Sequence, residues 1–230
     1  MGEHILPGNP PVALILRRSS RARRISLRVS GLDGRVTLTL PRGVSEREGL
    51  AFAREKERWL RGHLASQPGD VQVVPGAVIP VEGEMLEIRQ GAGRSLKRAE
   101  GALLVPGDPA QAGARVQGWL KALARDRLAA ASDRHAATLG RGYARLTLRD
   151  TRSRWGSCSS QGALMYSWRL VLAPAEVLDY VAAHEVAHLA HMDHSRAFWD
   201  QVTALYGDYS APRAWLRTEG SALHRYRFGA

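Results

Sequence analysis

Two histidines, His184 and His188, flank Glu185 in the spacing H-E-x-x-H. On an α-helix, residues i and i+4 lie about 40° apart around the axis, so both rings project from one face and can bind one metal ion. Imidazole nitrogen suits zinc, and a catalytic zinc takes three protein ligands and leaves one position for water. Glu185 is placed to accept a proton from that water. The spacing therefore predicts a hydrolytic centre with one Zn²⁺ per chain.

The third ligand has two candidates in the residues that follow. His194 lies just past the expected end of the helix and can turn back towards the other two rings. His191 is i+3 from His188 and i+7 from His184, so it shares their face if the helix continues. The spacing alone leaves both open. A helix carrying ordinary surface histidines is the alternative interpretation of the whole stretch.

The residues before and after this helix predict elements that position it. Alternating apolar residues at 146–149 and a second run at 163–170 predict a hairpin immediately before the helix, which begins near Pro174. In zinc peptidases, a sheet edge beside the metal helix holds an extended substrate by main-chain pairing. The pair Phe198 and Trp199 is expected to pack under the metal site. Cys158, between the two strands, is interpreted as a packed residue and not as a ligand.

The composition bounds the class of protein. With 230 residues, of which 44% are apolar, the chain is predicted to be globular. No apolar run reaches the roughly 20 residues that a membrane span needs, and residues 12–16 are too short for a signal peptide. The single cysteine cannot form an internal disulfide, which fits a reducing compartment. We therefore expect a cytoplasmic protein with no membrane partner, and the sequence does not indicate its oligomeric state.

The charge is strongly positive, with a formal net charge of +11 from 33 basic and 22 acidic residues. This balance suggests an anionic partner such as nucleic acid or a nucleotide, although arginine-rich composition also follows from genomic base composition. A basic cluster near the N-terminus is a candidate for anion binding; it comprises Arg17, Arg18, Arg21, Arg23 and Arg24. An equally good interpretation is that the cluster is the solvated edge of a hairpin, where charge prevents the edge strand from pairing with a wrong strand.

Several motifs together resemble a known family. They are R-W-G-S-C-S at 154–159, W-R-L-x-x-A-P at 168–174, D-Y-V-x-x-H-E-x-x-H-L at 179–189 and H-S-x-x-F-W at 194–199. These motifs resemble the YgjP-like metallopeptidase family, which is similar in turn to the SprT-like and WLM zincins. Less specific N-terminal motifs at 23–29, 38–44 and 55–59 extend the resemblance over nearly the whole chain.

The resemblance implies an α+β fold with a zincin-like metallopeptidase core, made of a small sheet and an active-site helix, and an N-terminal β-rich subdomain. We expect a flexible leader at 1–11, the subdomain with one helix at 12–105, and the metallopeptidase domain at 106–230. The resemblance implies that His184, His188 and His194 hold zinc and that Glu185 is the general base. It favours His194 over His191, because the spacing of five residues after H-E-x-x-H matches a zincin pattern.

One departure concerns Ser167, where many relatives carry Asn, so the role of that Asn in orienting the site is in doubt here. The sequence contains no clear oxyanion stabiliser. Tyr166, Tyr180 and His224 are the candidates for stabilising the transition state or contacting the substrate.

The leading hypothesis is a zinc-dependent metallopeptidase that cleaves a peptide or protein substrate. Three alternatives stay open. The same chemistry can cleave a nucleotide phosphoanhydride, with arginines binding the phosphates. The chain can be a protease acting on nucleic-acid-bound proteins, by analogy with SprT-like proteins. It can also be a non-catalytic zinc scaffold that binds peptides, although the presence of Glu185 argues against that.

Overall fold

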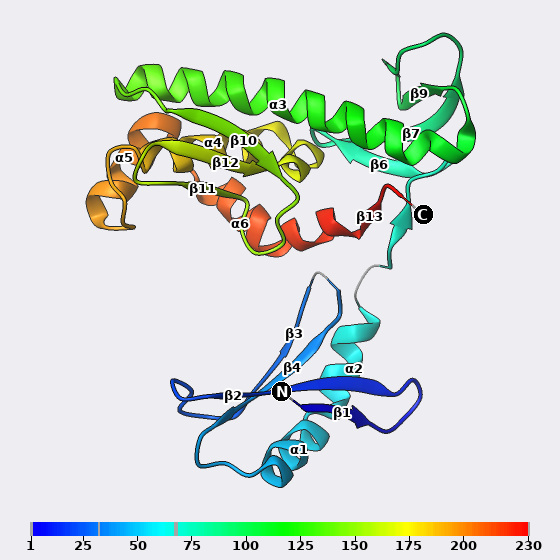
Figure 1. Cartoon of the computed structure of the whole chain (residues 1–230), viewed down its shortest axis with the longest axis vertical. Coiled ribbons are helices and arrows are strands. Elements are labelled where there is room, and N and C mark those ends of the chain that lie inside the picture. Colours follow the sequence, from blue (N-terminus) through cyan, green and yellow to red (C-terminus); the bar gives the residue numbers. More distant parts are fainter. Residues whose placement is uncertain (1, 32, 67–68, 230) are drawn as a thin grey trace. The chain divides into compact units, whose positions relative to one another are not determined.

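The computed structural model describes residues 2–31, 33–66 and 69–229 and divides the chain into two compact units, Met1–Gly69 and Asp70–Ala230 (Figure 1). Each unit has its own hydrophobic core. The fold is α+β, as expected, because each unit combines helices with sheets that contain both parallel and antiparallel strand pairs. Within the described residues, none of the helices is both long and apolar enough to span a membrane.

The first unit is a four-stranded sheet with two helices. In chain order its elements are β1 (Gly2–Leu6), β2 (Val12–Ser19), β3 (Ser26–Val29), β4 (Val36–Pro41), α1 (Glu46–Glu55) and α2 (Glu57–Ala65). The strand order is β1-β2-β4-β3, in which β2 and β4 are parallel and the other pairs are antiparallel. Alternate residues of β2 and β4, such as Leu14 and Leu38, are fully buried in the core of this unit. Ser45 caps α1 and forms the expected capping box with Glu48.

Two expectations for this region are corrected. Residues 2–6, expected in a flexible leader, form β1 and pair with β2; Met1 lies outside the described residues. The physical reason is that Leu6, only 2% exposed, contributes to the core. The one helix expected in the N-terminal subdomain is divided in two at Lys56, which ends α1 and precedes α2.

The second unit begins with β5 (Val71–Gln72), and its first sheet has the order β6-β7-β9-β8. The strands of that sheet are β6 (Val78–Val81), β7 (Glu84–Gly91), β8 (Lys97–Ala99) and β9 (Ala102–Pro106). A turn of 3₁₀ helix, Pro109–Gln111, leads into the long helix α3 (Ala112–Leu139), which ends at Gly140 in a left-handed conformation with φ 72°. Figure 1 shows α3 running along both the first sheet and the helices that follow it.

The remaining elements build the metal-helix region. They are β10 (Arg145–Arg149), β11 (Gly156–Cys158), β12 (Ala163–Ser167), a 3₁₀ turn at Trp168–Leu172, α4 (Ala175–Ala187), α5 (Arg196–Tyr206), α6 (Ser210–Thr218), a 3₁₀ turn at Gly220–Arg225 and β13 (Tyr226–Arg227). The sheet has the order β10-β12-β11. The hairpin expected between 146–149 and 163–170 is wrong, because β10 and β12 pair in parallel and the intervening β11 forms the antiparallel partner of β12. Strand β11 is therefore an edge strand, and it contacts α4. Strand β13 returns to pair with β5.

The division between the units differs from the one expected near residue 105. Strands β6 to β9 were expected in the N-terminal subdomain, whereas the compact units divide between Gly69 and Asp70. The reason is burial: Ile79, Leu86 and Ile88 belong to the same core as α3 and α4. Apolar alternation identifies these strands but does not reveal which helix covers them.

Candidate metal centre

Helix α4 carries the first two histidines. His184 lies in its last turn and His188 is its C-cap, so the helix ends at the second histidine and does not continue to His191. Most of α4 is buried, because α3, α5, α6 and β11 all contact it. This enclosure holds the helix rigidly and explains why its sequence is apolar on nearly every side.

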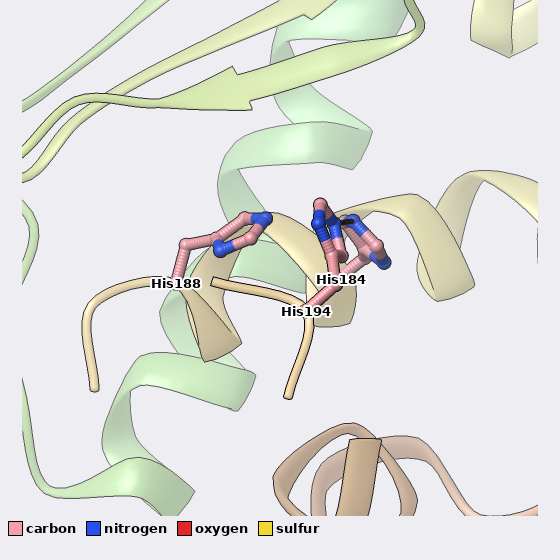
Figure 2. A group of neighbouring side chains, drawn as sticks. All are labelled: His184, His188 and His194. Atoms are coloured by element: carbon pink, nitrogen blue, oxygen red, sulfur yellow. Dashed lines mark hydrogen bonds between the residues drawn. The ribbon is translucent and has the colours of Figure 1, made fainter. Parts of the chain in front are cut away.

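Three histidines from two segments come together at the end of α4. Ligand-type nitrogens of His184, His188 and His194 all lie within 4.8 Å of one another (Figure 2). The Nε2 atoms of His184 and His194 are 3.2 Å apart. Tetrahedral zinc with bonds of 2.0–2.1 Å places two ligand nitrogens about 3.3 Å apart, so this pair fits such an ion. His191 is not part of the group.

Hydrogen bonds orient the ring of His188 and the turn that carries His194. The Nδ1 atom of His188 lies 2.9 Å from the carbonyl oxygen of His191, so Nδ1–H donates and Nε2 is left with its lone pair free. The backbone N–H of Ser195 donates to Asp193, and the Ser195 hydroxyl accepts from Phe198 N–H as the N-cap of α5. The turn between α4 and α5 is thereby fixed on both sides of His194.

Aromatic side chains of α5 pack against the cluster, as expected from the sequence. The fully buried ring of Phe198 stacks on the ring of His188, with 4.4 Å between ring centroids. It meets the rings of His184 and His194 edge-on, at centroid distances of 4.9 and 4.8 Å. The ring centroid of Trp199 lies 5.6 Å from that of His184 and 5.8 Å from that of His194. This wall excludes water from one side of the histidines and keeps their rotamers fixed.

The environment favours neutral imidazoles, the form that binds a metal. Burial, together with the neighbouring rings of His188 and His194, lowers the pKa of His184 to about 3. Burial also lowers the pKa of His188. The Nδ1 atom of His184, the ring nitrogen other than the one that faces His194, is buried and has no hydrogen-bond partner among the described residues. A donor set of three imidazole nitrogens fits zinc.

Glu185 lies one residue after His184 and is 5% exposed. Its carboxyl group lies against β11: a Cβ atom on Gly156 would be 2.6 Å from Cγ and 2.7 Å from Cδ of Glu185. Burial raises the pKa of Glu185 to about 8, and the positive charge of Arg154 opposes that increase. The carboxyl group therefore sits between the metal-binding helix and the edge strand, where it can exchange a proton.

The other expected site residues are placed as follows. Tyr166 is fully buried, and its hydroxyl shares a 3.0 Å hydrogen bond with Ser132 of α3. Tyr180 is 5% exposed, with its ring 6.0 Å from that of His184 and stacked on Tyr209 at 5.8 Å. His224 is 4% exposed, its ring centroid lies 5.3 Å from that of Trp155 at an interplanar angle of 34°, and burial lowers its pKa to about 4. Of the three, Tyr180 is the one whose ring contacts a histidine of the cluster.

The remaining expected residues lie elsewhere or have no ligand role. The five arginines at 17–24 belong to the first compact unit. Ser167 is fully buried, and its hydroxyl has no hydrogen-bond partner among the described residues. Cys158 is a free, half-buried thiol whose pKa burial raises to about 11, and it is not in the metal-ligand group.

Two arginines near the cluster were not predicted from the sequence. The guanidinium of Arg213, from α6, lies 4.5 Å above the Trp199 ring, and its charge contributes to lowering the pKa of His184. The positive charge of Arg154 likewise acts to lower the pKa of Glu185. Within the described residues, neither guanidinium forms an ion pair. No periodic pattern in the sequence identifies these two arginines, because each acts on a residue that belongs to a separate segment of the chain.

Comparison with known protein families identifies the family to which the chain belongs. The family model of the YgjP-like metallopeptidase domain matches residues 23–219. The crystal structure of the metallopeptidase zymogen of Pyrococcus abyssi abylysin is similar over 40% of this chain and 95% of that chain, with 19% identity and a TM-score of 0.36. No curated protein shows significant similarity. Because the family model covers most of the sequence, including α4 and its three histidines, the chain belongs to the YgjP-like metallopeptidase family.

Proposed function

We propose that this protein is a zinc-dependent peptidase in which His184, His188 and His194 hold one zinc ion and Glu185 is the general base. The observation that carries the proposal is the convergence of three ring nitrogens within 4.8 Å, directly beside a buried carboxyl group. Zinc held by these residues would lower the pKa of a bound water to about 7 and would polarise the scissile carbonyl.

The chain's own residues supply the proton transfers. Glu185 accepts a proton from the attacking water and then donates it to the leaving nitrogen, which requires a carboxyl group that gains and loses a proton readily. Its burial against Gly156 keeps it close to the metal-binding face of α4 and away from bulk water. Tyr180 is the residue that we favour for contacting the substrate, because its ring lies beside His184.

The edge strand β11 supplies the means of holding an extended substrate. It pairs with β12 on one side only, and it contacts the helix that carries the histidines. A peptide added along its free edge forms main-chain hydrogen bonds without a demand for particular side chains. The scissile bond of a peptide bound there passes close to Glu185, because Gly156 at the start of β11 contacts that carboxyl group.

Replacement of one atom tests this mechanism. Glu185→Gln removes the proton acceptor while preserving size, so zinc content measured by elemental analysis should be unchanged and hydrolysis of a fluorogenic peptide library should fall at least about a hundredfold. Glu176→Gln, at an exposed position in the first turn of the same helix, is the matched control and should retain activity. Retained hydrolysis in the zinc-loaded Glu185 variant would contradict the proposal.

Arg154 and Arg213 favour a second candidate, the hydrolysis of a nucleotide phosphoanhydride. Both are cations without an ion-pair partner among the described residues, and both act electrostatically on the site. Arginine binds phosphate oxygens in a bidentate manner. Phosphate release from nucleoside triphosphates, abolished in Glu185→Gln and weakened in Arg213→Gln, would establish this activity. Peptide cleavage without any phosphate release would exclude it.

A further inference from the structure

The topology of the first unit gathers arginines at one end of its sheet. Because β2 and β4 are parallel, both end at the same edge, where Ser19 pairs with Pro41. Strand β3 is antiparallel to β4 and starts at that same end, where Ser26 pairs with Thr39. The ends of the two parallel strands and the loop at 20–25 therefore lie together. The arginines at this end, which we call the arginine cluster, are Arg17, Arg18, Arg21, Arg23, Arg24, Arg28 and Arg42.

The register places part of this cluster on the open face of the sheet. Arg17 pairs with Thr39 and Arg28 pairs with Thr37, so both share the face opposite to Leu38, which points into the core. Helices α1 and α2 lie on the core side, where they contact β4 and β3. The loop arginines are also exposed. Exposed arginines therefore extend from the open face of the sheet, at the strand ends, into the loop.

These guanidinium groups have no acidic partners. Within residues 2–31 and 33–66, no carboxylate forms an ion pair with a member of the cluster. Four of the unit's six acidic side chains form ion pairs elsewhere: Asp33 with Arg35, Glu46 with His4, Glu55 with Lys56, and Glu57 with Arg61. Within the described part of the unit, Arg18 is the one member of the cluster that donates a side-chain hydrogen bond, to the carbonyl oxygen of Val44 at 2.9 Å. The positive charge is therefore uncompensated.

The division of charge between the units argues against a purely compositional origin. Residues 1–69 contain 13 basic and 6 acidic residues, a net charge of +7, whereas residues 70–230 contain 20 basic and 16 acidic residues, a net charge of +4. The first unit thus holds most of the total of +11 in less than a third of the chain. Genomic base composition affects both units alike and does not explain this asymmetry.

We propose that the arginine cluster of the first unit is a nucleic-acid-binding surface that contacts the phosphate backbone. Exposed, unpaired arginines complement the regular negative charge of a nucleic acid strand and release its condensed counterions on binding. Residues 17–29 contain no aromatic side chain on which a base can stack. Binding is therefore independent of base sequence and strongly dependent on salt. This inference goes beyond peptidase activity and does not depend on the metal centre.

The experiment measures binding of the full-length protein to labelled oligonucleotides, single-stranded and duplex, by fluorescence anisotropy over a range of salt concentrations. The variant Arg21→Gln/Arg23→Gln/Arg24→Gln removes three loop arginines that make no structural contact. Its affinity should fall at least tenfold at low salt. The slope of log K against log salt should shrink by about 2 for single strands and about 3 for duplexes, since each lost phosphate contact removes about 0.7 or 0.9.

The matched control is Arg35→Gln/Arg54→Gln/Arg58→Gln, which removes three exposed arginines of the same unit outside the cluster. Circular dichroism and thermal unfolding verify that both triple variants are folded. The control should bind nearly as tightly as the wild type. Equal weakening of the two variants would overturn the proposal, because it would show a diffuse charge effect. Absence of wild-type binding at low salt would also overturn it, as would binding only to vesicles containing phosphatidylserine.

Discussion

Gly156 and Glu185 are in contact across β11 and α4, with the carboxyl group of Glu185 occupying the space that a side chain at 156 would need. A Cβ atom there would lie 2.6 Å from Cγ of Glu185, which is closer than side-chain atoms normally approach. The glycine is required by this contact, because the carboxyl group is enclosed by the edge strand. The edge strand thereby determines where the proposed general base lies.

Gly156→Ala is expected to displace the Glu185 carboxyl group without removing any histidine. A shift of about 1 Å in a catalytic group can cost about a hundredfold in rate, so kcat/KM should fall by that order while zinc content stays at the wild-type level. Gly142→Ala is the control, because its added methyl group meets nothing within 4 Å. Unchanged activity in Gly156→Ala would mean that the position of this carboxyl group is not critical.

The metal-ligand set is tested by comparing His194→Ala with His191→Ala. His194 has a ring nitrogen in the cluster, whereas His191 contributes only its carbonyl oxygen, which an alanine retains. Elemental analysis should find one zinc per chain in the wild type and in His191→Ala, with zinc lost or much weakened in His194→Ala. Loss of the stabilisation that bound metal provides should also lower the Tm of His194→Ala in the presence of zinc. The opposite pattern would make His191 the third ligand.

His224 predicts a pH dependence of stability. Burial lowers its pKa in the folded protein from 6.5 to about 4, so between these values the unfolded chain binds more protons than the folded one. The contribution of neutral, buried His224 to the free energy of unfolding is therefore fully present above pH 6.5 and is lost as the pH falls towards 4. The full shift corresponds to about 3 kcal/mol of unfolding free energy, as an upper limit.

The comparison uses His224→Phe, which keeps a ring against Trp155 and does not titrate. Chemical denaturation at several pH values between 7 and 4.5 gives the free energy of unfolding for both proteins. The wild type should lose stability more steeply than the variant over this range, and His184 contributes equally to both. A difference between the two proteins that does not change with pH would show that His224 does not drive the dependence.

The local features of the site were determined by the sequence. The spacing of His184 and His188 places both on one face of a helix, whatever surrounds it, and α4 carries His184 in its last turn and His188 as its C-cap in helical conformation. The capping serines at 45 and 195 likewise act within one turn of their helices. Such features depend on the helical repeat and on hydrogen bonds between near neighbours, and for that reason the residues themselves reveal them.

Contacts between distant segments were decided by the tertiary structure alone. The parallel pairing of β2 with β4, the inclusion of β6 to β9 in the same core as α3, and the placement of Arg213 over Trp199 all join residues far apart in the chain. An apolar alternation shows that a strand has a buried face but not which element covers it. The Gly156–Glu185 contact has the same origin, since only the packing of β11 on α4 creates the need for a glycine.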